Sequence, residues 1–542
     1  MTTFMPDERA GPSKGERSAW TRRRFLTLTG MASLALGACA TRAPAQGGRG
    51  APLSSSALGR AARERPLAVL DRLTWGATQG DLTSLRHLGM AAYLRAQLHP
   101  APEAPLPPEV AAQLQAMTIN RMPVAELVRG GLERLRDIRA SDLPADQKQA
   151  QLKVAQRAVS APAREAAEQQ LLYALYSPNQ LQEQLVWFWM NHFSVFQYKG
   201  MLRPMMGDYY TRVIKPHALG RFRDLFRSTV FSPQMLIYLD NARNARGHVN
   251  ENYAREIMEL HTLGVDAGYT QQDVTNLARV LTGLGVNPLG RPRQMRPMLH
   301  GGFEHQDLVV FNPSRHDPDP KVVLGHTFAG HGLDEIDAVI DLLAAHPATA
   351  RHITTKLAQC FVADRPPAAL IDRMVAGWTR SEGDLAVVLE AMFTAPEFAA
   401  SLGSMFKDPI HYVVSSVRLA YEGRVIRNAG PMVAWLYRLG EPLYGRQTPD
   451  GYPVDAGAWN SPGQMTTRFE LARMIGSGPA GLFTTDVPGA RPVAAFPQLA
   501  NALFYDAIQP TLAPATREAL AQATSPQQWN ALLLSSPEFM HR

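Results

Sequence analysis

Residues 163–196 read AREAAEQQLLYALYSPNQLQEQLVWFWMNHFSVF, a strongly apolar stretch with helical spacing. Near its end, Leu185, Trp189, His192 and Phe196 fall on one face, which is the pattern of a buried helix. Helical spacing continues through residues 212–239 and recurs in most segments after residue 66. The sequence therefore predicts a mainly α-helical protein.

The helices are expected to form one large multi-helix domain over residues 67–542, with a loop-rich middle section. Lys, Arg, Glu and Gln are dense in residues 110–160, which favours a charged, solvated helical hairpin. Residues 285–330 are rich in His, Pro and Gly and have the least helical pattern. A second loop, rich in Gly and Pro, is expected over residues 476–497.

Two short runs of β-type residues lie inside the loop-rich section, at residues 308–311 and 321–324. Because they bracket a turn, they predict a small β-hairpin. Helices are expected before them, over residues 249–263 and 271–284, and after them from His346-Pro347 onward.

The composition is that of a packed protein, because 45% of the 542 residues are hydrophobic and 19% are charged. These values exclude a disordered chain and a collagen-like chain. The net charge is +7, but the first 39 residues hold six basic and three acidic side chains. The rest of the chain is nearly balanced in charge, so we expect no nucleic-acid partner.

The sequence has two cysteines, Cys39 and Cys360. Cys39 belongs to a leader segment, so no disulfide is expected within the folded body. The count also excludes zinc sites built on several thiolates and cysteine-ligated iron–sulfur clusters. Cys360 lies in a helical pattern and is expected to be a small core residue.

The leader has the features of an export signal. The paired arginines Arg22 and Arg23 are followed by Arg24, Phe25 and Leu26, as in a twin-arginine signal. The apolar stretch from residue 25 to residue 38 ends in small residues and is too short to cross a membrane. We therefore expect export by the twin-arginine route.

Leu36-Gly37-Ala38-Cys39 is similar to a lipobox, in which the cysteine is lipidated and becomes the mature N-terminus. Residues 1–39 would then be the signal, and residues 40–66, rich in Gly, Ser, Pro and Arg, a flexible tether. This predicts a protein of the periplasm or outer envelope, held to a membrane by an N-terminal lipid. The alternative is that Cys39 is an incidental small residue of an ordinary signal.

Five segments together resemble the bacterial family known as domain of unknown function 1800. They are FWMNHF at 188–193, LIYLDN at 236–241, NENYARE at 250–256 with ELHTLG at 259–264, HD at 316–317 with KVVLG at 321–325, and HPATAR at 346–351. The resemblance covers the chain from about residue 67 to its last residue. The family has no established activity, and its members are commonly exported. Its genes often lie beside those of an exported family with an alkaline-phosphatase-like fold, which implies a possible partner.

The expected helix over residues 249–263 carries the first candidate residues. At 100° per residue, its buried stripe consists of Tyr253, Ile257, Leu260 and Gly264. Glu256 flanks the stripe on one edge and His261 on the other, about 140° apart. With Asn252 and with Asp240 from the preceding loop, Glu256 could form an acidic cleft for a hard cation. The alternative is that Glu256 binds a neighbouring backbone group or arginine.

His192 lies on the apolar face of its helix, so it is either a buried, hydrogen-bonded residue or a metal ligand or general base. His316 and Asp317 are adjacent, and a carboxylate next to an imidazole can orient it or share a metal with it. Their alternative role is turn formation in the Asp-Pro sequence that follows.

These residues define a candidate site. Glu256, His316 and Asp317 are its candidate catalytic residues, and Asp240, Asn252, His192 and His261 its candidate ligands for a divalent metal ion. In an enzyme, at least three of the seven should converge in one cleft. Glu256 is the first choice as general base, since burial of an unpaired carboxyl raises its pKa.

Two classes of function follow. The first is a metal-assisted, hydrolase-like enzyme of the periplasm or cell surface, in which the metal activates a water. The second is a non-catalytic envelope protein that docks or matures the alkaline-phosphatase-like partner. The sequence has no dinucleotide-binding glycine motif, no phosphate-binding loop and no nucleophile elbow.

Overall fold

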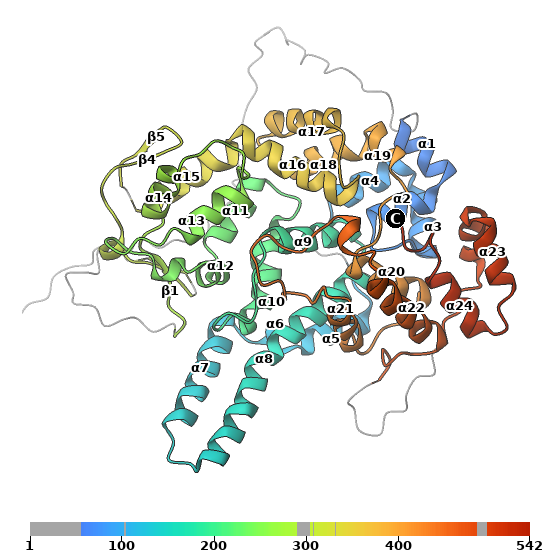
Figure 1. The fold of residues 1–542 in the computed structure, drawn as a ribbon, viewed down its shortest axis with the longest axis horizontal. Helices are drawn as coiled ribbons and strands as arrows, with labels where there is room; N and C mark the ends of the chain where they lie inside the picture. Colours follow the sequence, from blue (N-terminus) through green and yellow to red (C-terminus); the bar gives the residue numbers. More distant parts are fainter. Residues whose placement is uncertain (1–55, 102–104, 290–303, 307, 331, 485–495) are drawn as a thin grey trace, which may run out of the picture. The chain divides into compact units, whose positions relative to one another are not determined.

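Helices α8 (Ala145–Tyr176) and α9 (Gln180–His192) carry the stretch that predicts the fold, and α9 is buried over most of its length. The computed structural model describes residues 56–101, 105–289, 304–306, 308–330, 332–484 and 496–542. Residues 51–542 form one compact unit. Other helices surround α9, and the protein is mainly α-helical, as the sequence predicts (Figure 1).

The described chain begins with four short helices. They are α1 (Ala57–Glu64), α2 (Pro66–Leu73), α3 (Gln79–Leu88) and α4 (Met90–Leu98). The expected tether over residues 40–66 is wrong for its last part, because α1 forms there. Ser56 caps α1 by accepting the N–H of Gly59 at 3.1 Å, and Leu58 and Ala61 are buried in the core.

A helical hairpin projects from the body of the protein (Figure 1). It is preceded by α5 (Pro108–Ala116) and α6 (Thr118–Arg121), and it consists of α7 (Val124–Ala140) and the first half of α8. The 32 residues of α8 extend about 48 Å. Its buried side chains begin only at Ala155, so its first part is solvated and the part beyond Pro162 belongs to the core.

The chain between α9 and the strands consists of short helical pieces. They are η2 (Arg203–Met205), α10 (Met206–Asp208), the π-helix η3 (Tyr209–Ile214), η4 (Lys215–His217), α11 (Phe222–Val230), α12 (Pro233–Tyr238), η5 (Asn241–Arg243), α13 (Asn252–Glu256), the π-helix η6 (Ile257–His261) and α14 (Gln271–Val280). The expected continuous helix over residues 249–263 is therefore divided into α13 and η6.

In the described part of the chain, five short strands form two small antiparallel sheets. They are β1 (Leu284–Val286), β2 (Glu304–Gln306), β3 (Val309–Phe311), β4 (Lys321–Val323) and β5 (His326–Phe328). The expected hairpin between residues 308–311 and 321–324 is wrong, because β3 pairs with β1 and β2, whereas β4 pairs with β5. Leu324 and Gly325 both have positive φ, which suits the tight turn between β4 and β5.

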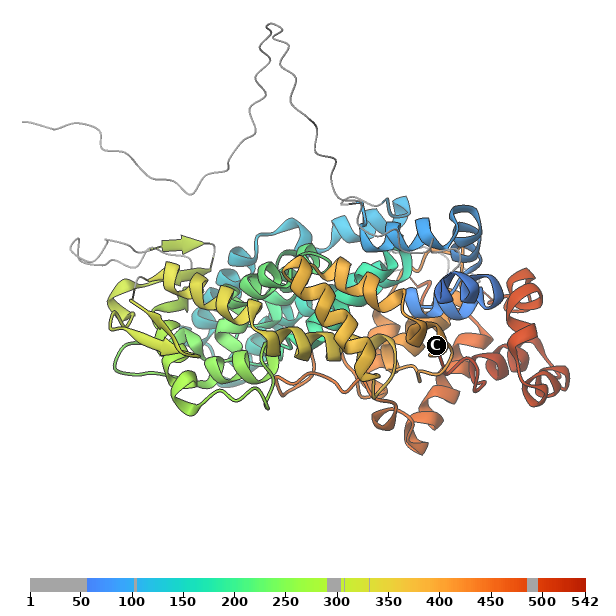
Figure 2. The same ribbon diagram turned by 90° about the horizontal axis from the view of Figure 1, so that it is seen from above.

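The remaining helices complete the fold. They are η8 (Pro313–Arg315), α15 (Leu333–Ala345), α16 (Pro347–Phe361), α17 (Ala368–Ser381), α18 (Leu385–Phe393), α19 (Pro396–Ala400), α20 (Pro409–Ala420), α21 (Gly430–Arg438), η9 (Ala456–Ala458), α22 (Pro462–Ser477), the π-helix η10 (Phe504–Ile508), η11 (Gln509–Thr511), α23 (Pro514–Ala521) and α24 (Pro526–Leu534). One hydrophobic core extends from α1 to the last residues. Figure 2 shows the strands at one end of this unit, and α1 to α3 beside α23 and α24 at the other.

The predicted export signal, with Arg22, Arg23, Phe25 and Leu26, and the predicted lipidation site Cys39 lie outside the described residues. Within the described part of the chain, no helix combines the length and the apolar character that crossing a membrane requires.

Candidate functional site

The last turn of α9 places His192 against the π-helix η6. His192 is 4% exposed, and its Nε2–H donates to the carbonyl oxygen of His261 at 3.2 Å. The imidazole must be the donor, because a carbonyl oxygen can only accept. This hydrogen bond leaves His192 Nδ1 buried without a hydrogen-bond partner among the described residues.

A π-helix gives His261 its position. On a regular α-helix, His261 would lie at the edge of the buried stripe. The wider i→i+5 winding of η6 instead places it in the core, where it is 1% exposed, and leaves Leu260 only half-buried. The carbonyl groups at the end of η6 lack helical partners. His192 donates to one of them, and His352 Nε2–H donates to the other, that of Leu260, at 3.1 Å.

Three imidazoles thus lie together. The ring centroid of His192 is 6.0 Å from that of His261 and 6.3 Å from that of His352. Burial lowers the pKa of all three side chains, to about 3 for His261, and the neighbouring charge of Lys356 lowers them further. The three imidazoles are therefore neutral at pH 7.

Lys356 lies one turn after His352 on α16 and faces the same group. Burial lowers the pKa of its ammonium, and the negative charge of Asp450 opposes this shift without cancelling it. No described residue forms a hydrogen bond or an ion pair with its Nζ. Lys356 is thus a partly buried amine whose uncharged form is favoured more than that of an ordinary lysine.

A cavity of about 240 Å³ adjoins this amine. Helix α9 contributes Phe188, Asn191 and His192 to its wall, and α16 contributes Lys356 and Gln359. The third wall is the loop that runs from Arg446 to Val454. Residues far apart in the sequence therefore surround one small polar space.

The loop is fastened to α9 by an amide side chain. Asn191 Nδ2 donates to the carbonyl oxygen of Tyr452 at 2.9 Å, and Asn191 Oδ1 accepts the N–H of Tyr452 at 2.6 Å. This close approach requires Gly451, which has a φ of +77° and no room for a side chain. An added Cβ would lie 2.3 Å from the backbone oxygen of Asn191.

The loop also brings an ion pair to the cavity. Arg446 Nη2 lies 2.9 Å from Asp450 Oδ2, and both residues line the wall. Burial raises the pKa of Asp450, but hydrogen bonds from Arg446 and Thr448 outweigh it and leave the pKa below its ordinary value. Asp450 therefore carries a fixed negative charge beside Lys356.

Glu256 is not among the residues that line the cavity, although the charge of Asp450 reaches it. Its carboxylate is half-buried and has no hydrogen-bond partner among the described residues. Burial raises its pKa, as do the charges of Glu259 and Asp450, against a smaller opposing effect of Arg255. A carboxyl of this kind is protonated more readily than an exposed one and can donate a proton.

Asp240 and Asn252 each contact a neighbouring segment of the chain. Asp240 has a φ of +63° and forms an ion pair with Lys199 at 2.8 Å. Asn252 Nδ2 donates to the carbonyl oxygen of Leu239 at 3.2 Å. In the described part of the chain, neither side chain forms a hydrogen bond or an ion pair with Glu256.

His316 and Asp317 belong to a separate buried network near the strands. His316 Nδ1–H donates to the Thr282 carbonyl at 2.8 Å, and its Nε2 lies 3.2 Å from a carboxylate oxygen of Glu335. Lys321 forms an ion pair with the same carboxylate at 2.9 Å. Asp317 accepts from Arg279 at 2.7 Å. These contacts connect α14, α15 and β4.

Of the seven candidate residues, the structure therefore brings His192 and His261 into direct contact. The structure does not bring the other five into contact with these two histidines. They are Asp240, Asn252, Glu256, His316 and Asp317. Among the residues that the structure describes, no group of three or more His, Cys, Asp or Glu side chains is placed to hold a metal ion.

Sequence reasoning missed His352, Lys356, Arg446 and Asp450. The first two could have been found, because they follow the HPATAR segment at 346–351 and lie four residues apart, on one helix face. The other two lie in an irregular loop about 90 residues later. No periodic pattern connects such a loop with α9 or α16.

Comparison with known proteins agrees with this fold. Residues 68–541 match the family described as protein of unknown function (DUF1800), so the chain belongs to that family. The match spans nearly all of the described unit, including α9, α16 and the loop that carries Asp450. No curated protein and no solved structure matches the chain.

Proposed function

We propose that the cavity beside α9 and α16 is the active site of a hydrolase-like enzyme, with Lys356 as its general base. One observation carries the proposal: the Lys356 amine lies in the wall of a small polar cavity and has no hydrogen-bond or ion-pair partner among the described residues. A lowered pKa increases the fraction of the amine that is uncharged, which is the form that accepts a proton.

The expected step begins with a water or substrate hydroxyl bound in the cavity. The uncharged amine of Lys356 accepts its proton as the oxygen bonds to an electrophilic centre of the substrate. Asp450 stabilises the ammonium that results. The bond from the electrophilic centre to the leaving group then breaks, and the Lys356 ammonium returns the proton to the leaving group. The guanidinium of Arg446, at the same wall, can attract an anionic group or carbonyl of the substrate.

The metal-assisted form of this enzyme would use the buried nitrogens His192 Nδ1 and His261 Nε2, which have no hydrogen-bond partner among the described residues. Metal sites in enzymes ordinarily take three protein ligands, and the described part of the chain supplies no such group. The proposed step therefore involves only Lys356 and its neighbours.

A comparison of variants tests the proposal. The full chain should be assayed with a panel of p-nitrophenyl esters, phosphates and glycosides. Lys356→Met should reduce any turnover by about 10²–10⁴-fold, the usual contribution of a general base. Its thermal unfolding should match that of Lys153→Met, which alters an exposed lysine of α8. Turnover that is unchanged in Lys356→Met would contradict the assignment.

We also propose that the enzyme works after export. Arg22 and Arg23 would direct it to the twin-arginine route, and Cys39 would attach it to a membrane of the envelope. Replacing both arginines by lysine should hold the precursor in the cytoplasm. Cys39→Ala should release the exported protein from the membrane fraction. Unchanged fractionation of both variants would contradict this location.

A second candidate function is non-catalytic docking or maturation of an exported alkaline-phosphatase-like partner. The projecting hairpin of α7 and α8 favours it, because its outer part is exposed and includes Val154 at 54% exposure. Co-purification of such a partner with the full chain, and its loss in Val154→Glu but not in Lys356→Met, would favour docking over catalysis.

A further inference from the structure

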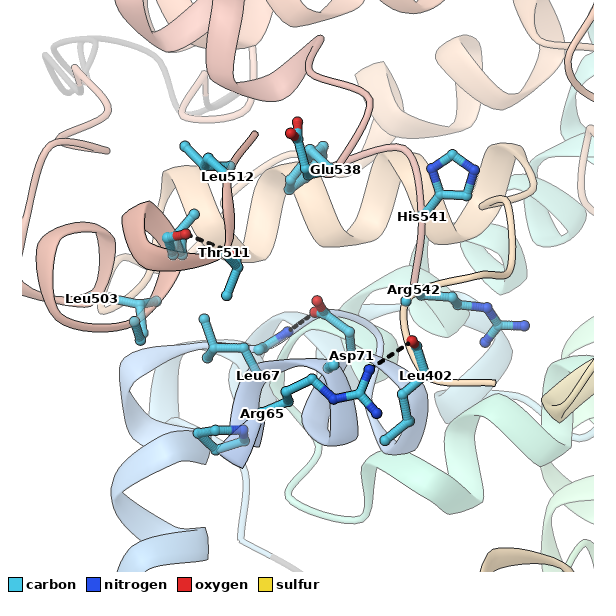
Figure 3. A pocket seen from close by; sticks show the side chains of 18 of the residues that line it. Arg65, Leu67, Asp71, Leu402, Leu503, Thr511, Leu512, Glu538, His541 and Arg542 are labelled. Carbon is cyan, nitrogen blue, oxygen red and sulfur yellow. Dashed lines mark hydrogen bonds between the residues drawn. The ribbon is translucent and has the colours of Figure 1, made fainter. Parts of the chain in front are cut away.

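A second, larger cavity lies between the N-terminal helices and the last segments of the chain (Figure 3). Its volume is about 700 Å³, within the range of roughly 300–1,000 Å³ that is typical of small-molecule sites. Its walls come from α2, from the segment that contains η10 and η11, and from the residues after α24. It shares no lining residue with the cavity at Lys356.

Much of this wall is apolar. Leu402, Leu503, Leu512 and Leu533 line the cavity and are each at most 5% exposed. Figure 3 shows Leu67, Leu503 and Leu512 around the same space, on elements from opposite ends of the chain. A wall of this kind suits a hydrocarbon chain, because it removes apolar surface from water.

Two buried cations, Lys407 and Arg542, are among the described residues that line this cavity. The Arg542 guanidinium already donates to Gln184 Oε1 and to the carbonyl oxygen of Cys360. Lys407 lines the cavity and is 2% exposed. Its Nζ lies 3.9 Å from the centroid of the Phe539 ring, which also lines the cavity. No described residue accepts a hydrogen bond from this ammonium or forms an ion pair with it.

Four acidic side chains of the described residues line the same cavity, and none of them forms an ion pair with Lys407. They are Glu64, Asp71, Asp506 and Glu538. Asp71 accepts the N–H of Ala77 at 2.8 Å, a bond drawn in Figure 3, and Glu538 accepts the N–H of Ala513 at 2.7 Å. Burial lowers the pKa of Lys407, the charges of Arg542 and Arg468 lower it further and Asp71 opposes them; the result is about 8. Lys407 thus remains mainly cationic at pH 7.

A buried ammonium without an anionic partner is costly, and its natural complement is a single negative charge. We propose that this cavity binds a long-chain carboxylate, with the carboxylate on Lys407 and the alkyl chain against the leucines. The cavity's volume, its apolar wall and its unpaired ammonium together define that ligand class. The proposal is independent of the function assigned to Lys356.

Displacement of a fluorescent fatty acid tests the proposal. The full chain, stripped of bound lipid, is titrated with cis-parinaric acid, which is then displaced by palmitate or by hexadecanol. The wild-type protein should bind palmitate about tenfold to a hundredfold more tightly than the alcohol, the range expected for a charge-assisted hydrogen bond. Lys407→Met should lose that preference and still bind both chains weakly.

A second variant distinguishes loss of the ligand from loss of the fold. Ala507 is half-buried and lines the same cavity, so Ala507→Trp should fill it and abolish binding while Lys407 remains. Lys153→Met, in the solvated first part of α8, is the matched control and should bind as the wild type does. Failure of the wild type to bind, equal affinity for palmitate and hexadecanol, or an unchanged preference in Lys407→Met would each overturn the proposal.

Discussion

Gly451→Ala is expected to destabilise the protein more than an alanine substitution at a loop glycine whose surroundings are open. Gly451 has a φ of +77°, and an added Cβ would lie 2.3 Å from the backbone oxygen of Asn191. That distance is far below van der Waals contact, and the obstacle is backbone. The loop must therefore move away from α9.

The size of the effect follows from two terms. A left-handed backbone costs an alanine about 1–2 kcal/mol. Moving the loop also breaks the two hydrogen bonds between Asn191 and Tyr452, at about 1 kcal/mol each. Together they predict a loss of about 3–4 kcal/mol in the free energy of unfolding. Gly423→Ala is the matched control, because Gly423 has a φ of +75° and no atom within 4 Å of an added Cβ.

Equilibrium unfolding in urea measures both variants. Gly423→Ala should lose only the backbone term, about 1–2 kcal/mol. Gly451→Ala should lose about 2 kcal/mol more than the control. Equal losses in the two variants would show that the loop does not contact α9 closely. The loop would then not form the third wall of the cavity.

Three further predictions concern other parts of the fold. Lys321→Met should lose about 3–5 kcal/mol in urea unfolding, because it leaves the Glu335 carboxylate buried without its ammonium; a loss below 1 kcal/mol would refute this. Burial lowers the pKa of His261 to about 3 in the folded protein, whereas an unfolded histidine has a pKa of about 6.5. Between these values, His261 is protonated in the unfolded chain and neutral in the folded one. The free energy of unfolding should therefore decrease from pH 6.5 towards pH 4, and His261→Asn should reduce the slope by up to about 1.4 kcal/mol per pH unit; identical slopes would contradict the burial. Glu422→Ala should lose about 1 kcal/mol in the same assay, since its carboxylate accepts the first two N–H groups of α3; no loss would show that this cap is weak.

The α-helical character of the protein could be predicted because apolar residues recur at helical spacing through most of the chain. Residues 163–196 illustrate both the success and its limit. Their pattern correctly predicts helix on both sides of residues 177–179, and His192 lies on a buried face as expected. The pattern could not show which residues would meet His192, since His261 and His352 come from distant segments.

The position of His261 shows a second limit. A helical wheel assumes 100° per residue, and that assumption fails in the π-helix η6. The wheel therefore placed His261 at an edge and Leu260 in the core, whereas the structure buries His261 and leaves Leu260 half-exposed. No residue in this segment marks the change of winding.

The strands show that local propensity does not determine pairing. Residues 309–311 and 321–323 are both strands, yet they belong to different sheets. The segment between them does not form a hairpin turn, and its Asp317 forms an ion pair with Arg279 of α14. The loop from Arg446 to Val454 likewise depends on a tertiary contact. Glycine is required at position 451 because the backbone there lies close to Asn191.

The pH dependence of Lys356 acetylation reports whether this amine is accessible and has a lowered pKa in the folded protein. Trace labelling of the folded full chain with acetic anhydride, followed by peptide mass spectrometry, gives the labelling midpoint of each lysine. We expect Lys356 to be labelled in the folded protein with a midpoint below the ordinary lysine pKa. Gly451→Ala should change the labelling rate of Lys356 and leave that of Lys153 the same. A Lys356 that reacts only after unfolding, or with a midpoint at or above the ordinary lysine value, would contradict its role as the base of this cavity.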